Sequence, residues 1–156
     1  MTLASFNAAP ADEAISAMLG CCASVRFAAA MAADRPYPSA AAAVAAVDAA
    51  FESMSWADVL EAMDGHPRIG ARVSGQSAAE QSGVADDTRG ALVAGNAAYE
   101  DRFGHVFLIF ATGLTGAQML AALQKRLNNN AEMERTVATA ELRKITLHRV
   151  ARELGP

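Results

Sequence analysis

The chain has 156 residues and a formal net charge of −4, with acidic and basic residues mixed along its length. A chain of this length suits one domain with a substantial core, so we expect residues 1–156 to form a single domain. The mixed charge disfavours a nucleic-acid-binding surface, which would show a clustered basic stripe. Anionic small molecules stay open as ligands, because a local arginine can bind them whatever the net charge.

Alanine makes up roughly a quarter of the chain, and alanine is the best helix former. Aromatic and β-branched residues, which favour strands, are sparse. The composition therefore predicts an all-α fold, a single compact bundle of about seven or eight helices.

The two cysteines of the chain, Cys21 and Cys22, are adjacent. Adjacent cysteines rarely pair with each other, so the sequence predicts no disulfide framework. The first residues lack the basic start and apolar core of a signal peptide. The longest strongly apolar run, at 106–111, is too short to span a membrane. We therefore expect a reduced, soluble, cytoplasmic protein without a membrane partner.

Prolines, serines and glycines divide the first half of the chain into helices. The predicted helices cover about residues 10–19, 24–33, 40–53 and 56–63. Pro10 followed by acidic residues suits a helix start, and Gly20 is expected to end that helix. Ser39 and Ser55 are good N-caps for the third and fourth helices. The prolines within 34–38 predict a firm turn, because proline cannot continue a helix.

The second half shows a similar division. Its expected helices cover about residues 77–82, 88–103, 115–127 and 131–152. Asp87 or Thr88 is expected to cap the second of these, and Gly104 to end it. Thr115 is the expected N-cap of the third, which is clearly amphipathic. The apolar run 105–110 is either a buried extended segment or the start of a buried helix, which periodicity alone does not decide.

A predicted loop at 64–76 holds His66 between two glycines and directly before Pro67. The residue before a proline is pushed out of the helical region, so the preceding helix should stop here and His66 should project from its end. A lone histidine is often structural or exposed. The alternative is a catalytic group, since reactive groups concentrate on loops held by rigid scaffolds. Metal binding is disfavoured, because His66, His105 and His148 lack the spacing of metal ligands.

Ser77 and Glu80 have the spacing of a capping box. One interpretation is that they only satisfy backbone donors at a helix start. The same helix end gathers free N–H groups and positive potential, which also suits an anionic ligand. A carboxylate there could orient an imidazole or bind a urea-like N–H edge.

Candidates for binding an acidic substrate include the arginines Arg68, Arg72, Arg126 and Arg149. Each is otherwise a surface charge or a salt-bridge partner. Arg149 is the most interesting of them, because its helix must bury one face. The run 107–111 is expected to be core, although its backbone groups would serve a ligand if it is extended. The residues alone thus indicate an α-helical domain with a His, Glu and Arg site, and they do not name the reaction.

Three ordered segments carry a resemblance to a known family. They are HPRIG at 66–70, SAAEQ at 77–81 and FGHVFLIFA at 103–111. Further similar positions lie at 6–7, 35–37, 55–56 and 123–149. With this set the chain resembles, along nearly its whole length, the OHCU decarboxylases, which act on 2-oxo-4-hydroxy-4-carboxy-5-ureidoimidazoline.

The resemblance implies a cofactor-independent decarboxylation of this ureidoimidazoline carboxylate to (S)-allantoin in urate degradation. It implies that His66 is a catalytic proton donor and that Glu80 acts with it. The implied substrate-binding residues are Pro67, Ser77, Gln81, Phe107, Leu108, Ile109, Phe110, Ala111 and Arg149. No metal or organic cofactor is implied, and a homodimer is one expectation because relatives include dimers. The alternative is a catalytically inactive helical module of the same fold that binds a small ligand or an interaction partner.

Overall fold

The computed structural model describes residues 1–70 and 86–155, which form eight helices and no strand. The all-α prediction is therefore confirmed for these residues. None of their helices is long and apolar enough to cross a membrane. The helix predicted at 77–82 lies outside the described residues.

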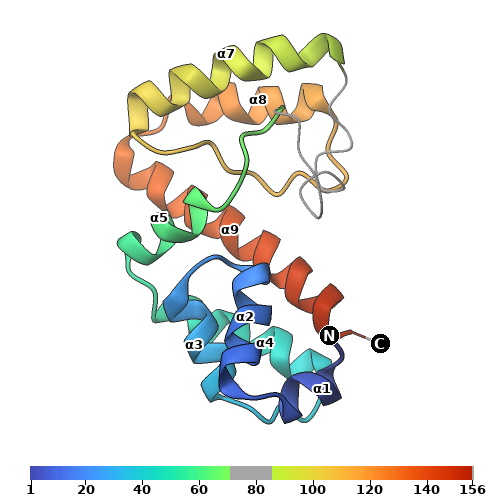
Figure 1. Cartoon of the computed structure of the whole chain (residues 1–156). Helices are drawn as coiled ribbons and strands as arrows, with labels where there is room; N and C mark the ends of the chain where they lie inside the picture. Colours follow the sequence, from blue (N-terminus) through green and yellow to red (C-terminus); the bar gives the residue numbers. More distant parts are fainter. Residues whose placement is uncertain (71–85, 156) are drawn as a thin grey trace. The chain divides into compact units, whose positions relative to one another are not determined.

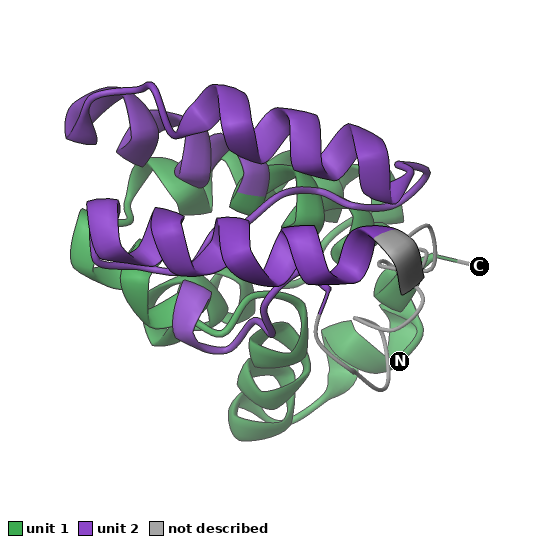
Figure 2. Ribbon diagram, turned by 90° about the horizontal axis from the view of Figure 1, so that it is seen from above, with its two compact units in different colours: residues 1–62, 142–156 green, residues 63–141 purple. Residues whose placement is uncertain are grey.

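The chain divides into two compact units, coloured separately in Figure 2. Unit 1 comprises residues 1–62 and 142–156, and unit 2 comprises residues 63–141. Each unit has buried side chains of its own. The expectation of one domain over residues 1–156 stays a prediction.

Unit 1 is built from short, alanine-rich helices. Its helices are α1 (Leu3–Ala8), α2 (Ala11–Cys21), α3 (Val25–Ala33) and α4 (Ala40–Glu52), with parts of α5 (Trp56–Asp64) and α9 (Ala131–Leu154). Helix α3 packs against both α2 and α4 (Figure 1). The Ser39 hydroxyl accepts a hydrogen bond from the Ala42 N–H at 3.1 Å, which confirms the predicted cap of α4.

Two features at the start of unit 1 differ from the prediction. Helix α1 was not expected, and α2 continues through Gly20 to Cys21 instead of ending at Gly20. Glycine inside a helix costs only about 1 kcal/mol relative to alanine. Burial of Met18 and Cys21 on the same helix outweighs that cost.

Large apolar side chains from several helices fill the core of unit 1. They include Phe6, Met18, Phe27, Met31, Val47 and Phe51. The rings of Phe27 and Phe51 meet edge to face with centroids 5.8 Å apart. Cys21 and Cys22 are buried and not joined in a disulfide. Burial raises the pKa of the Cys21 thiol to about 12 and that of Cys22 to about 11.

Arg35, just beyond α3, binds backbone carbonyls at the ends of two helices. Its guanidinium donates to the carbonyls of Phe6 and Ala9 at 2.6 and 2.8 Å, and to that of Ala32 at 2.8 Å. It also lies over the Phe6 ring, 5.3 Å from the centroid. These bonds satisfy carbonyls that the helices leave unpaired at their C-termini.

In unit 2, α7 (Asp86–Phe103) and α8 (Gly116–Arg126) lie side by side (Figure 1). Helix α7 begins earlier than predicted, so Asp87 and Thr88 lie inside it and neither is its N-cap. Acidic residues are favoured in the first turn by the helix dipole, which makes a cap and a first-turn residue hard to distinguish in sequence. The end of α7 is as predicted, since Gly104 has a φ of +77°, in the left-handed region that glycine adopts freely.

Thr115 caps α8 as predicted. Its hydroxyl accepts from the Gln118 N–H at 3.1 Å, and the Gln118 side chain accepts from the Thr115 N–H at 2.9 Å. The two bonds form a capping box. Gly95 lies where α8 approaches α7 closely, and a Cβ there would lie 2.7 Å from a methyl carbon of Leu123, which would have to shift.

One buried apolar cluster forms the core of unit 2. Its members are Ile69, Leu92, Tyr99, Phe107, Ile109, Ala111, Met119 and Leu123. They come from the loop after α5, from α7, from the segment 106–111 and from α8. Several elements distant in sequence are thereby fixed around a single core.

Candidate active site

His66 lies in the loop that follows α5. Its backbone N–H donates to the Met63 carbonyl at 2.9 Å, and the helix has ended at Asp64, as expected for a residue before proline. His66 and Pro67 are both half-buried. The predicted partners Ser77, Glu80 and Gln81, and also Arg72, lie outside the described residues, so their roles stay predictions.

Ile69 connects the His66 loop to the core of unit 2. Its side chain is 4% exposed and belongs to the same cluster as Phe107, Ile109 and Ala111. The structure therefore brings the loop that bears His66 and the predicted substrate-binding segment into one buried cluster. Burial of these apolar side chains fixes both against each other.

The segment 106–111 forms neither a helix nor a strand, which excludes the buried-helix alternative. Four of its side chains are buried, namely Phe107, Leu108, Ile109 and Ala111, and Phe110 is half-buried. Arg126 Nη1 donates to the Leu108 carbonyl at 2.6 Å, and the Phe110 N–H donates to Glu141 Oε2 at 2.9 Å. Side chains thus supply hydrogen-bond partners to the backbone of this segment, which neighbouring strands of a β-sheet would otherwise provide.

Arg126 also forms a buried ion pair with Glu134. Its Nε and Nη2 lie 2.7 and 2.5 Å from Glu134 Oε1, and the two side chains are 8% and 0% exposed. The Tyr99 hydroxyl donates to the same oxygen at 2.5 Å, and Asn129 Nδ2 donates to Oε2 at 3.0 Å. The Arg126 guanidinium lies 4.5 Å from the centroid of the Phe107 ring. We call Tyr99, Arg126, Asn129 and Glu134 the buried polar cluster.

The buried polar cluster assigns Arg126 a structural role. Its guanidinium is bound to Glu134 and to the Leu108 carbonyl. Of the two interpretations of Arg126, the contacts therefore favour the salt-bridge partner over the substrate-binding residue. Burial, together with the hydrogen bond to Glu134, raises the pKa of Tyr99 well above its usual range. Tyr99 therefore stays a hydrogen-bond donor at neutral pH. Sequence reasoning missed this cluster, because a charge that pairs inside a core looks like a surface charge in sequence.

The other candidate arginines have different surroundings. Arg68 pairs with Glu100 at 2.6 Å, and their side chains are 60% and 26% exposed. Arg149 lies in unit 1 on α9 and is buried. Its assignment as the substrate-binding arginine stays a prediction. Within the described parts of the chain, no three His, Cys, Asp or Glu side chains are grouped so that they could hold a metal ion.

Comparison with known proteins finds one family and several relatives. The family model described as OHCU decarboxylase matches residues 7–151. The uric acid degradation bifunctional protein TTL of Arabidopsis thaliana is 35% identical over 144 residues, which are 85% of this chain and 44% of that protein. The chain thus spans less than half the length of this curated relative.

Solved structures show the same fold. An OHCU decarboxylase crystallised in the presence of (S)-allantoin matches with a TM-score of 0.78 and 33% identity, over 86% of this chain and 94% of that one. An (S)-allantoin synthase matches with a TM-score of 0.76 over 99% of this chain and 54% of that one. Its identity of 23% supports the fold alone.

Proposed function

The chain belongs to the OHCU decarboxylase family, and we propose on this premise that it converts 2-oxo-4-hydroxy-4-carboxy-5-ureidoimidazoline to (S)-allantoin in urate degradation. The observation that carries the proposal is the shared packing of Ile69, from the His66 loop, with Phe107, Ile109 and Ala111. The loop of the proposed proton carrier and the proposed substrate-binding segment thus share one core, which supports the proposal.

The substrate contains its own electron sink. Its carboxylate leaves a carbon that also bears a hydroxyl and lies beside a ring C=N bond. When CO₂ departs, the electron pair of the broken bond forms a C=C bond, and the C=N electrons move to the nitrogen, which takes a proton. The resulting enol loses its hydroxyl proton and gains a proton on the ureido-bearing carbon, which gives allantoin. The protein then needs to bind, orient and move protons, and no electron-accepting cofactor is required.

His66 is the proposed proton donor, and delivery to one face of the ureido-bearing carbon sets the (S) configuration. Histidine is suited to this step because its unperturbed pKa lets it give or take a proton at neutral pH. Glu80 is proposed to act with His66, and Arg149 to bind a carboxylate or oxyanion. The remaining proposed substrate contacts are Pro67, Ser77, Gln81 and the segment 107–111.

A direct assay tests the proposed activity. The unstable ureidoimidazoline is generated in situ from urate, its ultraviolet decay is followed, and the circular dichroism of allantoin reports the enantiomer formed. The wild-type chain should accelerate the decay and yield (S)-allantoin. A decay no faster than the spontaneous rate would refute the enzyme and favour the inactive ligand-binding module.

The role of His66 is tested in the same assay. Loss of a general acid typically lowers the rate by about 10²–10⁴-fold, so His66→Ala should lower kcat within this range. His105→Gln is the matched control, since His105 is a half-buried histidine of the same unit with no proposed catalytic role. Equal rates for His66→Ala and wild type would refute the assignment of the proton donor while leaving the reaction itself in place.

A cytoplasmic location and a homodimer are also part of the proposal. Both follow from the composition and from the resemblance to the family. Fractionation of the source cells tests the first, and sedimentation velocity of the purified chain tests the second.

A further inference from the structure

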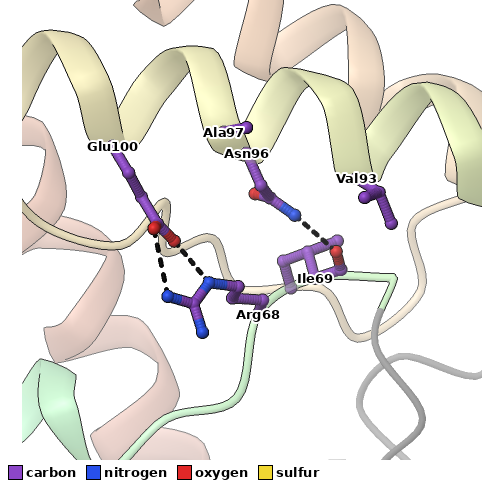
Figure 3. A pocket seen from close by; sticks show the side chains of 6 residues that line it. All are labelled: Arg68, Ile69, Val93, Asn96, Ala97 and Glu100. Carbon is purple, nitrogen blue, oxygen red and sulfur yellow. Dashed lines mark hydrogen bonds and ion pairs between the residues drawn. The ribbon is translucent and has the colours of Figure 1, made fainter.

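The loop that carries His66 is tied to one face of α7 by side-chain hydrogen bonds. Three consecutive loop residues take part, namely Arg68, Ile69 and Gly70. Figure 3 shows two of the contacts, the ion pair between Arg68 and Glu100 and the bond from the Asn96 amide to the Ile69 carbonyl. In the third, Arg89 Nη1 donates to the Gly70 carbonyl. We call these three contacts the loop anchors.

The geometry of the loop anchors is specific. Arg68 binds Glu100 through two parallel bonds, Nε to Oε1 at 2.6 Å and Nη2 to Oε2 at 3.0 Å. Asn96 Nδ2 lies 2.6 Å from the Ile69 carbonyl oxygen. Asn96 precedes Glu100 by one helical turn, so both side chains leave the same face of α7.

Packing alone does not account for Asn96. The residue is 3% exposed, and its Oδ1 is a buried oxygen without a hydrogen-bond partner among the described residues. A buried acceptor without a donor is destabilising, so an apolar side chain would suit this position better if only packing mattered. Among the described residues, the favourable contribution of the amide is its bond to the Ile69 carbonyl.

The space beside the anchors supports the same interpretation. A pocket of about 220 Å³ lies beside the anchors, against residues of both the loop and α7 (Figure 3). It is lined by Arg68, Ile69, Val93, Asn96, Ala97 and Glu100. Side chains of residues 1–70 and 86–155 do not fill this space, so their close packing holds the loop less tightly here than in the core. The polar anchors therefore fix the position of the loop on this side.

We propose that Glu100 and Asn96 are positioning residues for His66. By holding residues 68 and 69 against α7, they fix the backbone that follows His66, which lies two residues before Arg68. The inference rests on the proposed function, in which His66 delivers a proton to the substrate. A catalytic group displaced by about 1 Å can lose about 100-fold in rate, so remote anchors of this kind affect the chemical step.

Glu100→Gln is the decisive variant, because its pair with Arg68 is partly exposed and contributes little to stability. We expect kcat to fall about tenfold with KM nearly unchanged, since substrate contacts are left in place. The matched control is Asp48→Asn, which breaks the exposed Arg143–Asp48 pair of unit 1, also 2.6 Å long. It should leave kcat and KM unchanged. The exchanged pair Arg68→Glu with Glu100→Arg should restore kcat by restoring the anchor.

Amide hydrogen exchange supplies a readout independent of turnover. In Glu100→Gln and in Asn96→Leu, the amides of His66, Arg68, Ile69 and Gly70 should exchange faster, while those of α8 keep the wild-type rate. Unchanged loop exchange would overturn the inference, and so would faster loop exchange with an unchanged kcat. Failure of the exchanged pair to restore kcat would also overturn it, because Arg68 would then act in its own right. A wild-type chain without activity would refute the proposed function instead. The hydrogen-exchange data would still show whether the loop anchors hold residues 68–70 against α7.

Discussion

Removal of the negative charge at Glu134 is the strongest test of the buried polar cluster. Glu134 is fully buried and accepts hydrogen bonds from Arg126, Tyr99 and Asn129. Glu134→Gln leaves the buried Arg126 cation without its partner. Breaking a buried pair in this way costs about 3–5 kcal/mol, because the remaining charge stays out of water without compensation. We therefore expect the free energy of unfolding to fall by about that amount.

Urea unfolding followed by circular dichroism at neutral pH measures this change. The variant Asp48→Asn, which removes the same charge from an exposed pair, serves as the control and should change stability little. Replacing the cluster by apolar residues, with Tyr99→Phe, Arg126→Met and Glu134→Leu together, should recover most of the loss, since no buried charge remains. A loss below about 1 kcal/mol for Glu134→Gln would refute the description of the pair as buried and coupled.

Three further predictions concern other parts of the molecule. Gly70→Ala should lower the free energy of unfolding by about 1–2 kcal/mol in the same urea assay, because Gly70 has a φ of +88° and a Cβ there would lie 3.2 Å from Leu92 Cβ. Cys21 and Cys22 should react with a thiol reagent such as DTNB only slowly at pH 8 in the folded chain, and at once in urea. At a pKa of about 11, only about one Cys22 thiol in a thousand is ionised at pH 8. The pKa of the Asp58 carboxyl is lowered, chiefly by hydrogen bonds from the backbone and hydroxyl of Ser55. The contribution of Asp58 to stability is therefore present above pH 3.8 and is lost as the pH falls through its folded-state pKa. Asp58→Asn should therefore flatten the acid limb of the stability curve measured by urea unfolding.

Helix boundaries set by local chemistry were predictable from the sequence. Ser39 and Thr115 cap their helices through bonds to residues three positions later, and Gly104 ends α7 in a left-handed conformation. Each signal involves only near neighbours in the chain. Helix α1 was missed because its capping box pairs Thr2 with Ser5, whereas the usual pattern has a glutamate or glutamine at the later position.

The candidate site was predictable only in part, for a physical reason. His66 drew attention through Gly65 and Pro67, whose effects on the backbone are local. The residues that hold the site together are not local, since Arg126 bonds to Leu108 and Asn96 bonds to Ile69, 27 positions away. Such pairs form only after the chain has folded, and each member alone resembles an ordinary polar surface residue.

The bonds of Arg35 have a consequence for local opening of the fold. Helix α1 has six residues, too few to persist on its own in water. Arg35 binds the carbonyls of Phe6 and Ala9 at its C-terminal end, so detachment of α1 must break both bonds and expose the Phe6 ring. A lysine could not replace this guanidinium, which holds three carbonyls with a rigid array of donors. Arg35, 26 positions beyond Ala9, therefore contributes to the resistance of α1 to proteolysis.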